Sequence, residues 1–428
     1  MTKPKGAENI NMIAEILSTG DEIRSGSLID SNSAYIARKL EEIGLEIVRH
    51  SCVGDSVESI SQILLEIGKR ADIAVVTGGL GPTLDDLSAV AAAQAGHVPV
   101  EYSALATQSI DAFFKSRNFP MNPSNKKQAM LPMGSKCLMN PVGTAPGFLI
   151  KIGQCDFYFL PGVPFEMRRM LEDQVTPRIL KKQGNKATCL VKTISTFGLT
   201  ESATGERIEE TNDMFPEIRV GLRAKFPEIQ VKLYGRSVNE DTLKQNMAII
   251  EKYVQEKLGR KIFSLEGEAM EAVVGRLLRQ KGAGLALAES CTGGLIAHRL
   301  TEISGSSDYF LFSGVTYSNA AKVKVLGVSE NGLLKYGAVH EKIAAQMAVG
   351  AQKIAGATYG LSTTGIAGPG GGTQEKSVGT VCIGLATPEK VITGKYHFPF
   401  GQRWMNKSIF AMKALDLLRR ELLKTQQG

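Results

Sequence analysis

The chain has 428 residues, which is long for one domain and predicts two or three. Hydrophobic residues make up 43% of it and charged residues 22%, a balance that argues against a disordered polypeptide. Its net charge of +7 is uneven, because residues 1–175 carry 20 acidic and only 16 basic side chains. That part of the chain is therefore a poor binder of nucleic-acid phosphates.

Two further global features bear on where the protein works. No run of about 18 apolar residues occurs, so we expect no membrane-spanning helix. The N-terminal stretch MTKPKGAENINMIAEIL is too polar for a signal peptide. The six cysteines are scattered without a CxxC pair, which predicts reduced thiols in a cytoplasmic protein and argues against a disulfide scaffold or a zinc ribbon.

Residues 10–175 are predicted to form the first domain, in which strands and helices alternate. We expect strands at 12–17, 45–55 and 72–76, and helices at 31–44 and 56–69. Such alternation predicts a doubly wound α/β domain with a mostly parallel sheet. Ligands of these sheets bind beyond the carboxyl ends of the strands, and both of the first glycine-rich loops fall there.

The loop TGGLGPTLDD at 77–86 combines a flexible backbone with a predicted helix N-terminus. Its glycines would let backbone amides approach phosphate oxygens, and its threonine could cap the helix. Its two aspartates could bind Mg²⁺ or could only favour the positive end of the helix dipole. The loop lacks the GK[ST] ending of a Walker loop. The residues concerned are Gly78, Gly79, Gly81, Thr83, Asp85 and Asp86.

Three more polar loops with glycine or proline turns occur in the same domain. They are TGDEIRSGSLIDSN at 19–32, with Gly20, Asp21 and Asn32; NPVGTAPGF at 140–148, with Thr144; and LPGVPFEM at 160–167, with Glu166. Together the four loops resemble the molybdopterin-binding fold, in the version found in the competence/damage-inducible protein A (CinA) family. The resemblance covers essentially the whole chain.

In that family the N-terminal domain is similar to ADP-ribose pyrophosphatases, which use a divalent metal such as Mg²⁺ to split the diphosphate. The resemblance implies nucleotide contacts from Gly20, Asn32, Gly78, Gly79, Gly81, Thr83 and Thr144. It implies metal ligands among Asp21, Asp85 and Asp86, with Asp55 on a neighbouring loop. Ser88 stands where the family pattern GGLGPTxDDxT has threonine, so the hydroxyl group is retained.

Residues 176–266 are predicted to form a small α+β module. Its expected elements are a strand at 187–196, a helix at 199–210, a strand pair at 217–224 and 228–237, and a helix at 243–259. This order is outwardly that of a KH domain, but the GxxG loop that clamps a nucleic-acid backbone is missing. We therefore favour a spacer or docking module over a nucleic-acid-binding one.

Residues 267–428 are predicted to form a third domain, again α/β. Its expected helices span 271–282 and 402–425, and its expected strands span 285–288, 309–318, 359–365 and 379–387. The first of these strands runs into AESCTGG at 288–294, a pattern typical of a nucleophile presented on a tight turn.

Ser290 is the favoured nucleophile of that turn, and the two glycines after it could supply backbone amides for an oxyanion hole. None of the five histidines sits in a recognisable triad motif, so a lysine is a candidate base; the alternative is that Lys322 is a surface lysine and Tyr317 a core tyrosine. Lys322 could serve if its pKa is lowered by burial, and Tyr317 could relay the proton or hold the lysine in place. Cys291 is the competing nucleophile, but neighbouring side chains at a strand end tend to point apart.

AESCTGG, the YSNxxK pattern and STTGIAGPGGG…KSVGTV at 362–381 resemble the CinA C-terminal domain, which is similar to nicotinamide mononucleotide (NMN) deamidase. The resemblance implies that Ser290, Tyr317 and Lys322 are catalytic and that this step needs no cofactor. It implies oxyanion or substrate contacts from Thr292, Gly293, Gly294, Gly365, Gly368, Gly370 and Arg403. Gln402 stands where the family has an acidic residue.

The family resemblance thus implies a bifunctional enzyme of pyridine-nucleotide salvage that hydrolyses NMN and ADP-ribose, and a homodimer; we expect this enzyme to be cytoplasmic. One alternative is that only one domain is active. A second is a nucleotide- or pterin-binding protein without turnover. A third is a DNA-handling protein, against which the absence of an aromatic and basic stripe argues.

Overall fold

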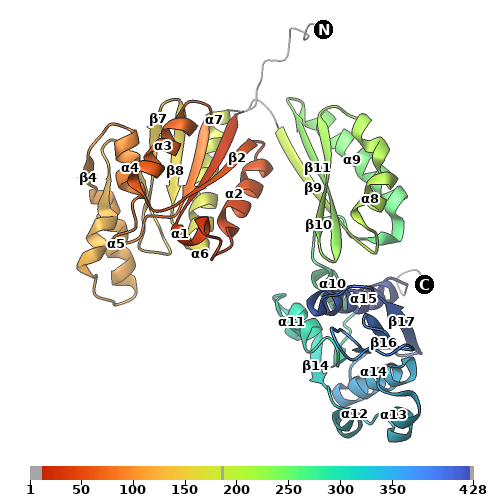
Figure 1. Cartoon of the computed structure of the whole chain (residues 1–428). Helices are drawn as coiled ribbons and strands as arrows, with labels where there is room; N and C mark the ends of the chain where they lie inside the picture. The colour runs from red at the N-terminus through yellow and green to blue at the C-terminus, as the bar shows by residue number, and fades with distance from the viewer. Residues whose placement is uncertain (1–11, 185–187, 425–428) are drawn as a thin grey trace. The chain divides into compact units, whose positions relative to one another are not determined.

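The structure is a computed structural model that describes residues 12–184 and 188–424 (Figure 1). It divides into two compact units, one made of the chain up to Leu190 with Gly235–Lys244, the other of Val191–Tyr234 with the chain from Gln245 onward. Among the described residues, no helix is both long enough and apolar enough to cross a membrane. The predicted segments that begin at 10 and 187, and those that end at 425 and 428, have these end residues outside the described ranges.

The first domain is built on a six-stranded sheet in the order β2-β1-β3-β8-β7-β6. The strands are β1 (Ile13–Thr19), β2 (Glu46–Val53), β3 (Ile73–Thr77), β6 (Lys136–Leu138), β7 (Gly147–Ile152) and β8 (Cys155–Leu160). The first four strands of that order run parallel; β7 runs antiparallel to β8, and the edge strand β6 runs antiparallel to β7. The predicted mostly parallel α/β sheet is confirmed, and the strands β7 and β6 are additional.

Helices cover both faces of this sheet (Figure 1). One face carries α2 (Ser31–Glu42), α6 (Pro164–Met170) and α7 (Thr176–Gln183); the other carries α3 (Val57–Gly68), α4 (Ser88–Ala95) and α5 (Ala104–Ser116). The remaining elements are α1 (Asp21–Arg24) and the strand pair β4 (Val100–Tyr102) and β5 (Met130–Pro132).

Helix α7 lies within the range predicted for the middle module, but it packs in the first domain. A single π-helical turn at Leu171–Val175 joins it to α6 without a break. Its side chain Ile179 is fully buried in the same hydrophobic cluster as Ile36 and Met170. A predicted boundary at 175 therefore cuts through a continuous helical segment.

The middle module has a four-stranded sheet in the order β10-β11-β9-β12. Its elements are β9 (Thr188–Phe197), α8 (Glu201–Arg207), β10 (Ile218–Lys225), β11 (Glu228–Ser237), α9 (Glu240–Leu258) and β12 (Ile262–Ser264). The predicted β-α-β-β-α order is confirmed, with one short strand added at the end.

The C-terminal domain has a five-stranded sheet in the order β14-β13-β15-β16-β17. The strands are β13 (Leu285–Glu289), β14 (Phe310–Val315), β15 (Tyr359–Gly365), β16 (Thr380–Ala386) and β17 (Val391–His397). Strand β13 is parallel to both of its neighbours, so the carboxyl ends of three strands meet at one edge.

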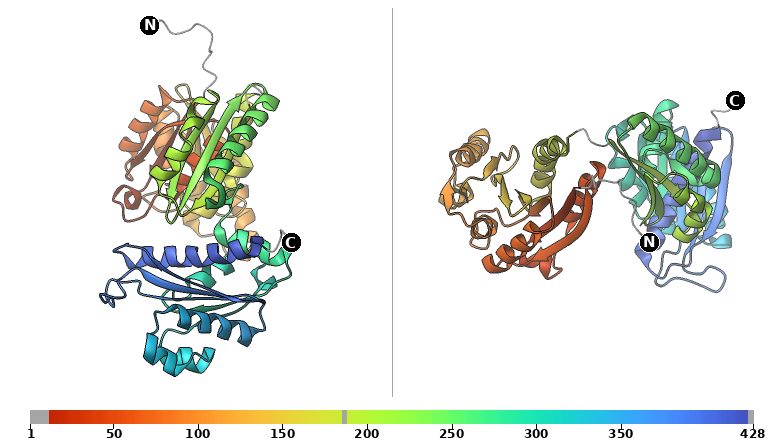
Figure 2. Two further views of the ribbon diagram at one scale, coloured as in Figure 1. Left: turned by 90° about the vertical axis from the view of Figure 1, so that its right-hand side faces the viewer. Right: turned by 90° about the horizontal axis from the view of Figure 1, so that it is seen from above.

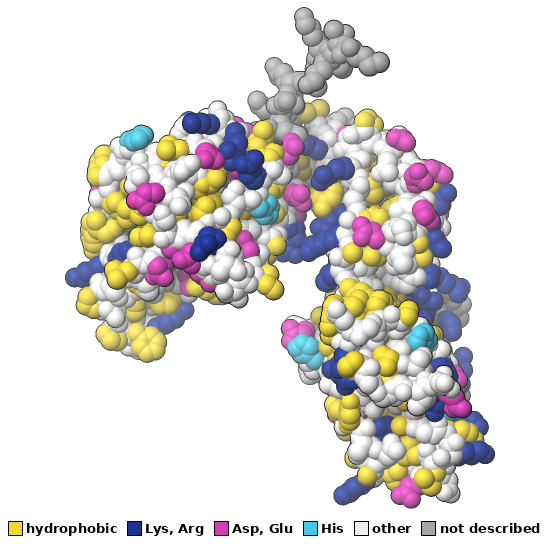
Figure 3. Space-filling model, viewed as in Figure 1, with side chains coloured by type: hydrophobic (Ala, Val, Ile, Leu, Met, Phe, Trp, Pro, Cys, Tyr) yellow, Lys and Arg dark blue, Asp and Glu magenta, His cyan; other side chains and the backbone are white. Residues whose placement is uncertain are grey.

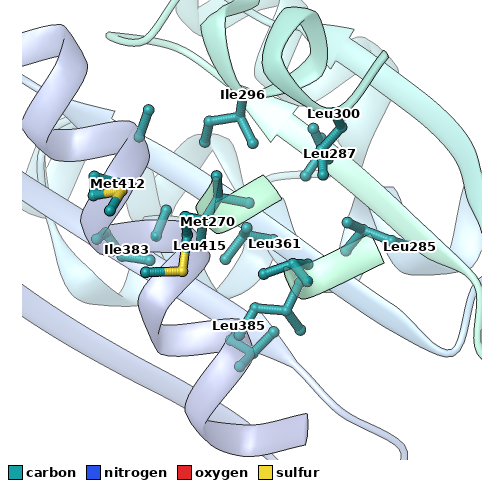
Figure 4. Packing of buried hydrophobic residues seen from close by; sticks show 14 of the residues in the cluster. Met270, Leu285, Leu287, Ile296, Leu300, Leu361, Ile383, Leu385, Met412 and Leu415 are labelled. Carbon is teal, nitrogen blue, oxygen red and sulfur yellow. The ribbon is translucent and has the colours of Figure 1, made fainter. Parts of the chain in front are cut away.

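Two helical layers sandwich this sheet (Figure 2). One layer holds α10 (Met270–Gln280), α11 (Leu295–Thr301) and α15 (Arg403–Lys424); the other holds α12 (Asn319–Leu326), α13 (Glu330–Tyr336) and α14 (Glu341–Ala355). Alternation along β13 explains the arrangement: its leucines pack toward α15, as Figure 4 shows for Leu285 and Leu287, while its alanines pack toward α14.

Candidate functional site

The chain turns sharply at the carboxyl end of β13, and this turn presents Ser290. The amide of Ser290 donates to the carbonyl of Thr363 on the neighbouring strand (3.0 Å), and the amide of Gly293 donates to the carbonyl of Ser290 (3.1 Å). Gly293 and Gly294 have φ angles of +58° and +86°, which glycine adopts without steric cost. The turn therefore depends on both glycines.

Of the two amides predicted for an oxyanion hole, that of Gly293 is committed to the turn itself. Among the described residues we find no acceptor for the amide of Gly294, so it is the better candidate for an oxyanion. Thr292, also predicted at this site, is fully buried, and its hydroxyl lies 2.7 Å from that of Thr363. Thr292 thus fixes the turn to β15 and does not face solvent.

Glu289, which the sequence analysis did not single out, anchors the same turn from below. Its carboxylate is fully buried and accepts hydrogen bonds from the amides of Ile296 (3.2 Å) and Ala297 (2.9 Å). These amides belong to the first turn of α11, where backbone donors have no partner within the helix. Glu289 therefore couples the end of β13 to the start of α11, and its adjacency to the nucleophile in AES was the available sequence signal.

Lys322 lies under the turn, with only 1% of its surface exposed. It belongs to the first turn of α12, which Ser318 caps through a hydrogen bond from the amide of Ala321 (3.1 Å). The Lys322 Nζ lies 3.1 Å from Ser290 Oγ, and it donates to the carbonyls of Thr316 (2.9 Å) and Tyr317 (3.0 Å). Sequence positions 32 residues apart are thus brought into direct contact.

Burial lowers the pKa of Lys322, because a charged ammonium is poorly solvated there; the neighbouring Cys291 acts weakly in the opposite direction. A neutral amine has two hydrogens and one lone pair. Two carbonyls occupy the hydrogens, so the remaining direction, toward Ser290 Oγ, is that of the lone pair. This is the arrangement that a general base for the serine needs.

Cys291 is placed unfavourably for nucleophilic attack. Its side chain is buried in the hydrophobic cluster that includes Leu287 and Ile296, on the side of the sheet covered by α15. Burial raises the pKa of its thiol to about 12, so the reactive thiolate does not form near neutral pH. The two neighbouring side chains point in different directions, and the geometry favours Ser290.

Tyr317 does not place its phenol against Lys322. The side chain is 59% exposed, and its hydroxyl accepts a hydrogen bond from Arg403 Nη2 (3.0 Å). Arg403 Nη1 also donates to the carbonyl of Gly368 (2.7 Å), in the predicted glycine loop at 365–372. The contact of Tyr317 with Lys322 runs through its backbone carbonyl, while its ring and Arg403 form an outer rim of the site.

The N-terminal domain has a cavity of about 410 Å³ at the carboxyl ends of its strands. All but two of the predicted N-terminal site residues line it, namely Gly20, Asn32, Gly78, Gly79, Gly81, Asp85, Asp86 and Thr144. The close packing of the loop explains its glycines: a Cβ on Gly79 would lie 2.3 Å from Ser88 Oγ, and one on Gly81 would lie 2.5 Å from an oxygen of Asp86. The loops predicted from sequence are therefore gathered at one cavity.

The two exceptions are Asp21, which pairs with Arg24 (3.0 Å), and Thr83. The proposal that Thr83 caps a helix was wrong, because the helix begins only at Ser88. The hydroxyl of Thr83 instead donates to Asp86 (2.6 Å) within a turn. For the same reason, the two aspartates of this loop do not sit on the first turn of a helix.

Glu166 lines this cavity and Asn140 contacts Glu166, although neither residue was assigned a role from sequence. Burial raises the pKa of the Glu166 carboxyl group. Asn140 is buried, donates to Glu166 Oε2 (2.7 Å), and accepts from the amide of Gly143 (2.9 Å). It therefore fixes Glu166 to the 140–148 loop. The two residues lie on separate loops, 26 positions apart, so the sequence alone did not indicate their contact.

A divalent metal fits this cavity only together with a ligand that brings oxygens of its own. Within residues 12–184 and 188–424, no three His, Cys, Asp or Glu side chains form a group that could hold a metal. Burial raises the pKa of Asp55, and the nearby carboxylates of Asp21, Glu22 and Asp85 raise it further. Mg²⁺ is commonly held by one or two carboxylates, with substrate phosphates and waters completing the shell. The carboxylates around Asp55 lie beside the glycine loop, so one or two of them could bind Mg²⁺ while a substrate diphosphate supplies further oxygens.

Three family descriptions match successive parts of the chain: "Probable molybdopterin binding domain" at 15–181, "Damage-inducible protein CinA KH domain" at 191–264 and "CinA C-terminal domain" at 267–422. A CinA-like protein of Desulfosudis oleivorans is 49% identical, over 96% of this chain and 100% of its own length. One of Citrifermentans bemidjiense is 42% identical, over 97% and 100%.

Two solved structures are similar to parts of the chain. One is a competence/damage-inducible protein of Agrobacterium tumefaciens, with 37% identity, a TM-score of 0.35, and coverage of 36% of this chain and 96% of that one. The other is a CinA protein of Thermoplasma acidophilum, with 28% identity, a TM-score of 0.36, and coverage of 39% and 98%.

The buried carboxylate of Glu289 leads to a stability prediction. Glu289→Ala leaves two amides of α11 without an acceptor, and we expect a loss of about 2–4 kcal/mol in the free energy of unfolding. Glu289→Gln keeps one carbonyl acceptor, so its loss should be smaller. Urea unfolding followed by circular dichroism measures both variants. Equal stability of Glu289→Ala and the wild type would contradict the assigned role.

Proposed function

The chain belongs to the CinA family, and we propose that its C-terminal domain hydrolyses the carboxamide of NMN to nicotinic acid mononucleotide and ammonia. The observation that carries this proposal is the contact between Lys322 Nζ and Ser290 Oγ at 3.1 Å, with the lysine buried. A serine paired with an unprotonated lysine is a known solution for amide hydrolysis without histidine.

In the first half-reaction, Ser290 Oγ forms a bond to the carboxamide carbon as its proton passes to Lys322 Nζ. The carbonyl oxygen becomes an oxyanion, to which the amide of Gly294 can donate a hydrogen bond. Lys322 then returns the proton to the departing nitrogen, so that ammonia leaves as the C–N bond breaks. The product is a nicotinoyl ester of Ser290.

Water completes the reaction by the same steps. Lys322 accepts a proton from the water that attacks the ester carbon, and it returns this proton to Ser290 Oγ as the C–O bond breaks. The released product is a carboxylic acid, and both protein groups are back in their starting state. The step uses no group beyond those of the chain and water.

Cationic side chains beside the turn suit the phosphate of a mononucleotide. Arg403 lies at the rim through its bonds to Tyr317 and Gly368, and the Lys407 ammonium lies 3.5 Å from the point where a Cβ on Gly293 would be. Arg403 and Lys407 stand four residues apart on α15, so they project from the same side of that helix. The ring of Tyr317 offers an exposed aromatic surface near them.

For the N-terminal domain we propose hydrolysis of ADP-ribose to AMP and ribose 5-phosphate with a divalent metal. The supporting observation is the cavity that joins a glycine loop to several carboxylates, among them Asp55, Asp85 and Glu166. A metal held by Asp55 and Asp85 would neutralise charge on the diphosphate. Glu166, whose pKa is raised by burial, is suited to take a proton from the attacking water.

The deamidase proposal predicts that purified protein releases ammonia from NMN without added metal. Ser290→Ala should reduce kcat by at least about a thousandfold, because the nucleophile is lost. Cys291→Ala should retain activity within a few-fold, since the thiol is buried and protonated. An ammonia assay on the three proteins decides the matter. Activity lost only in Cys291→Ala would move the nucleophile, and a folded wild type without activity would reject the proposal.

The N-terminal proposal predicts AMP release from ADP-ribose that requires Mg²⁺ or a similar ion. Asp85→Asn should raise the metal concentration needed for half-maximal rate, and Glu166→Gln should lower kcat with little change in that concentration. Chromatographic assay of AMP over a metal titration separates the two effects. Tight binding of ADP-ribose without any AMP would favour a nucleotide-binding domain instead.

A further inference from the structure

The turn between β10 and β11 in the middle module places an aromatic side chain against the C-terminal domain; both belong to the same compact unit. The ring of Phe226, at this turn, packs edge-on against Phe400 (5.1 Å between centroids) and Trp404 (5.7 Å). Figure 3 shows hydrophobic side chains gathered where the module and the domain meet. Edge-on aromatic pairs of this kind contribute beyond the area that they bury.

The two rings that Phe226 touches lie on either side of Arg403 in the chain. Arg403 begins α15 and donates to the carbonyl of Gly368. One turn further on, the fully buried Asn406 donates to the carbonyls of Ala367 (3.0 Å) and Phe400 (2.9 Å). The start of α15 is thus the anchor of the glycine loop at 365–372, and Phe226 packs on that anchor from outside.

The glycine loop has little other support at its tip. Residues 369–375 are exposed, and a Cβ built on Gly370 would meet no atom within 4 Å. Its position is therefore set at its base, where Arg403 and Asn406 donate to it and Ile366 shares backbone hydrogen bonds with the end of the loop segment. A displacement of Phe400 or Trp404 would move these two donors and the loop together.

We propose that the β10–β11 turn of the middle module is a positioning element for the C-terminal site, with Phe226 as its positioning residue. The ring acts through Phe400 and Trp404 on Arg403, and through Arg403 on the glycine loop and the ring of Tyr317. The middle module then contributes to substrate affinity and leaves the Ser290–Lys322 pair untouched. This inference rests on the proposed NMN hydrolysis only where substrate affinity is the readout.

The chain contains a single tryptophan, and it is Trp404. Its fluorescence therefore reports on this contact without interference from any other indole. In the full-length protein, Phe226→Ala should shift Trp404 emission to longer wavelength, because the indole, 57% exposed beside Phe226, loses its apolar neighbour. The KM for NMN should rise about three- to tenfold with kcat within twofold, since two ring contacts are lost and the reacting pair is unchanged.

Two further variants make the test specific. Phe226→Tyr keeps the ring and should restore most of the emission and the KM. Phe119→Ala removes a ring that is 66% exposed in the first domain, and both readouts should remain those of the wild type. A folded Phe226→Ala with wild-type Trp404 emission, or with a lowered kcat at unchanged KM, would overturn the proposal. If the wild type does not hydrolyse NMN, the deamidase proposal fails, while the Trp404 emission of Phe226→Ala still decides the contact.

Discussion

The burial of one amine, that of Lys322 against Ser290 Oγ, is the constraint on which the C-terminal domain depends. A lysine that is 1% exposed costs free energy unless its hydrogens find acceptors or its charge is lost. Two backbone carbonyls supply the acceptors, at Thr316 and Tyr317, and burial lowers the pKa. Both carbonyls exist in that position only because β14 ends at Val315, before the chain enters α12.

The rest of the C-terminal domain fixes the position of Ser290, the partner of Lys322. Strand β13 lies between two strands that are both parallel to it, so Ser290 appears where three carboxyl ends meet. Glu289 ties that end to α11, and Thr292 ties the turn to β15. These contacts lie below the reacting atoms and shape the turn without facing substrate. Arg403 performs the matching task at the rim, where it joins the glycine loop to the ring of Tyr317.

Much of this organisation could be predicted from sequence, because it rests on local patterns. Alternating strands and helices, the glycine turn after Ser290 and the order of elements in the middle module all have short-range signals, and the structure has each of them. Contacts between segments that are separated in the chain have no short-range signal in the sequence. The pairing of Asn140 with Glu166 and the assignment of α7 to the first domain both depend on contacts between separate segments. The prediction that Thr83 caps a helix was wrong because the TLDD turn has the composition of a helix cap but precedes the helix, which begins at Ser88.

The most direct test of the account is the pH dependence of kcat/KM for NMN, which reports the ionisation of groups in the free enzyme. Burial favours the neutral amine of Lys322, so its proton should leave at lower pH than from an ordinary lysine. We predict a rate that rises with the loss of one proton, with the midpoint of this rise below the pH at which an exposed lysine titrates. That limb should be missing in Lys322→Arg, whose guanidinium stays charged. A limb centred at the ordinary lysine pKa, or one that persists in Lys322→Arg, would contradict the claim that this lysine is the base.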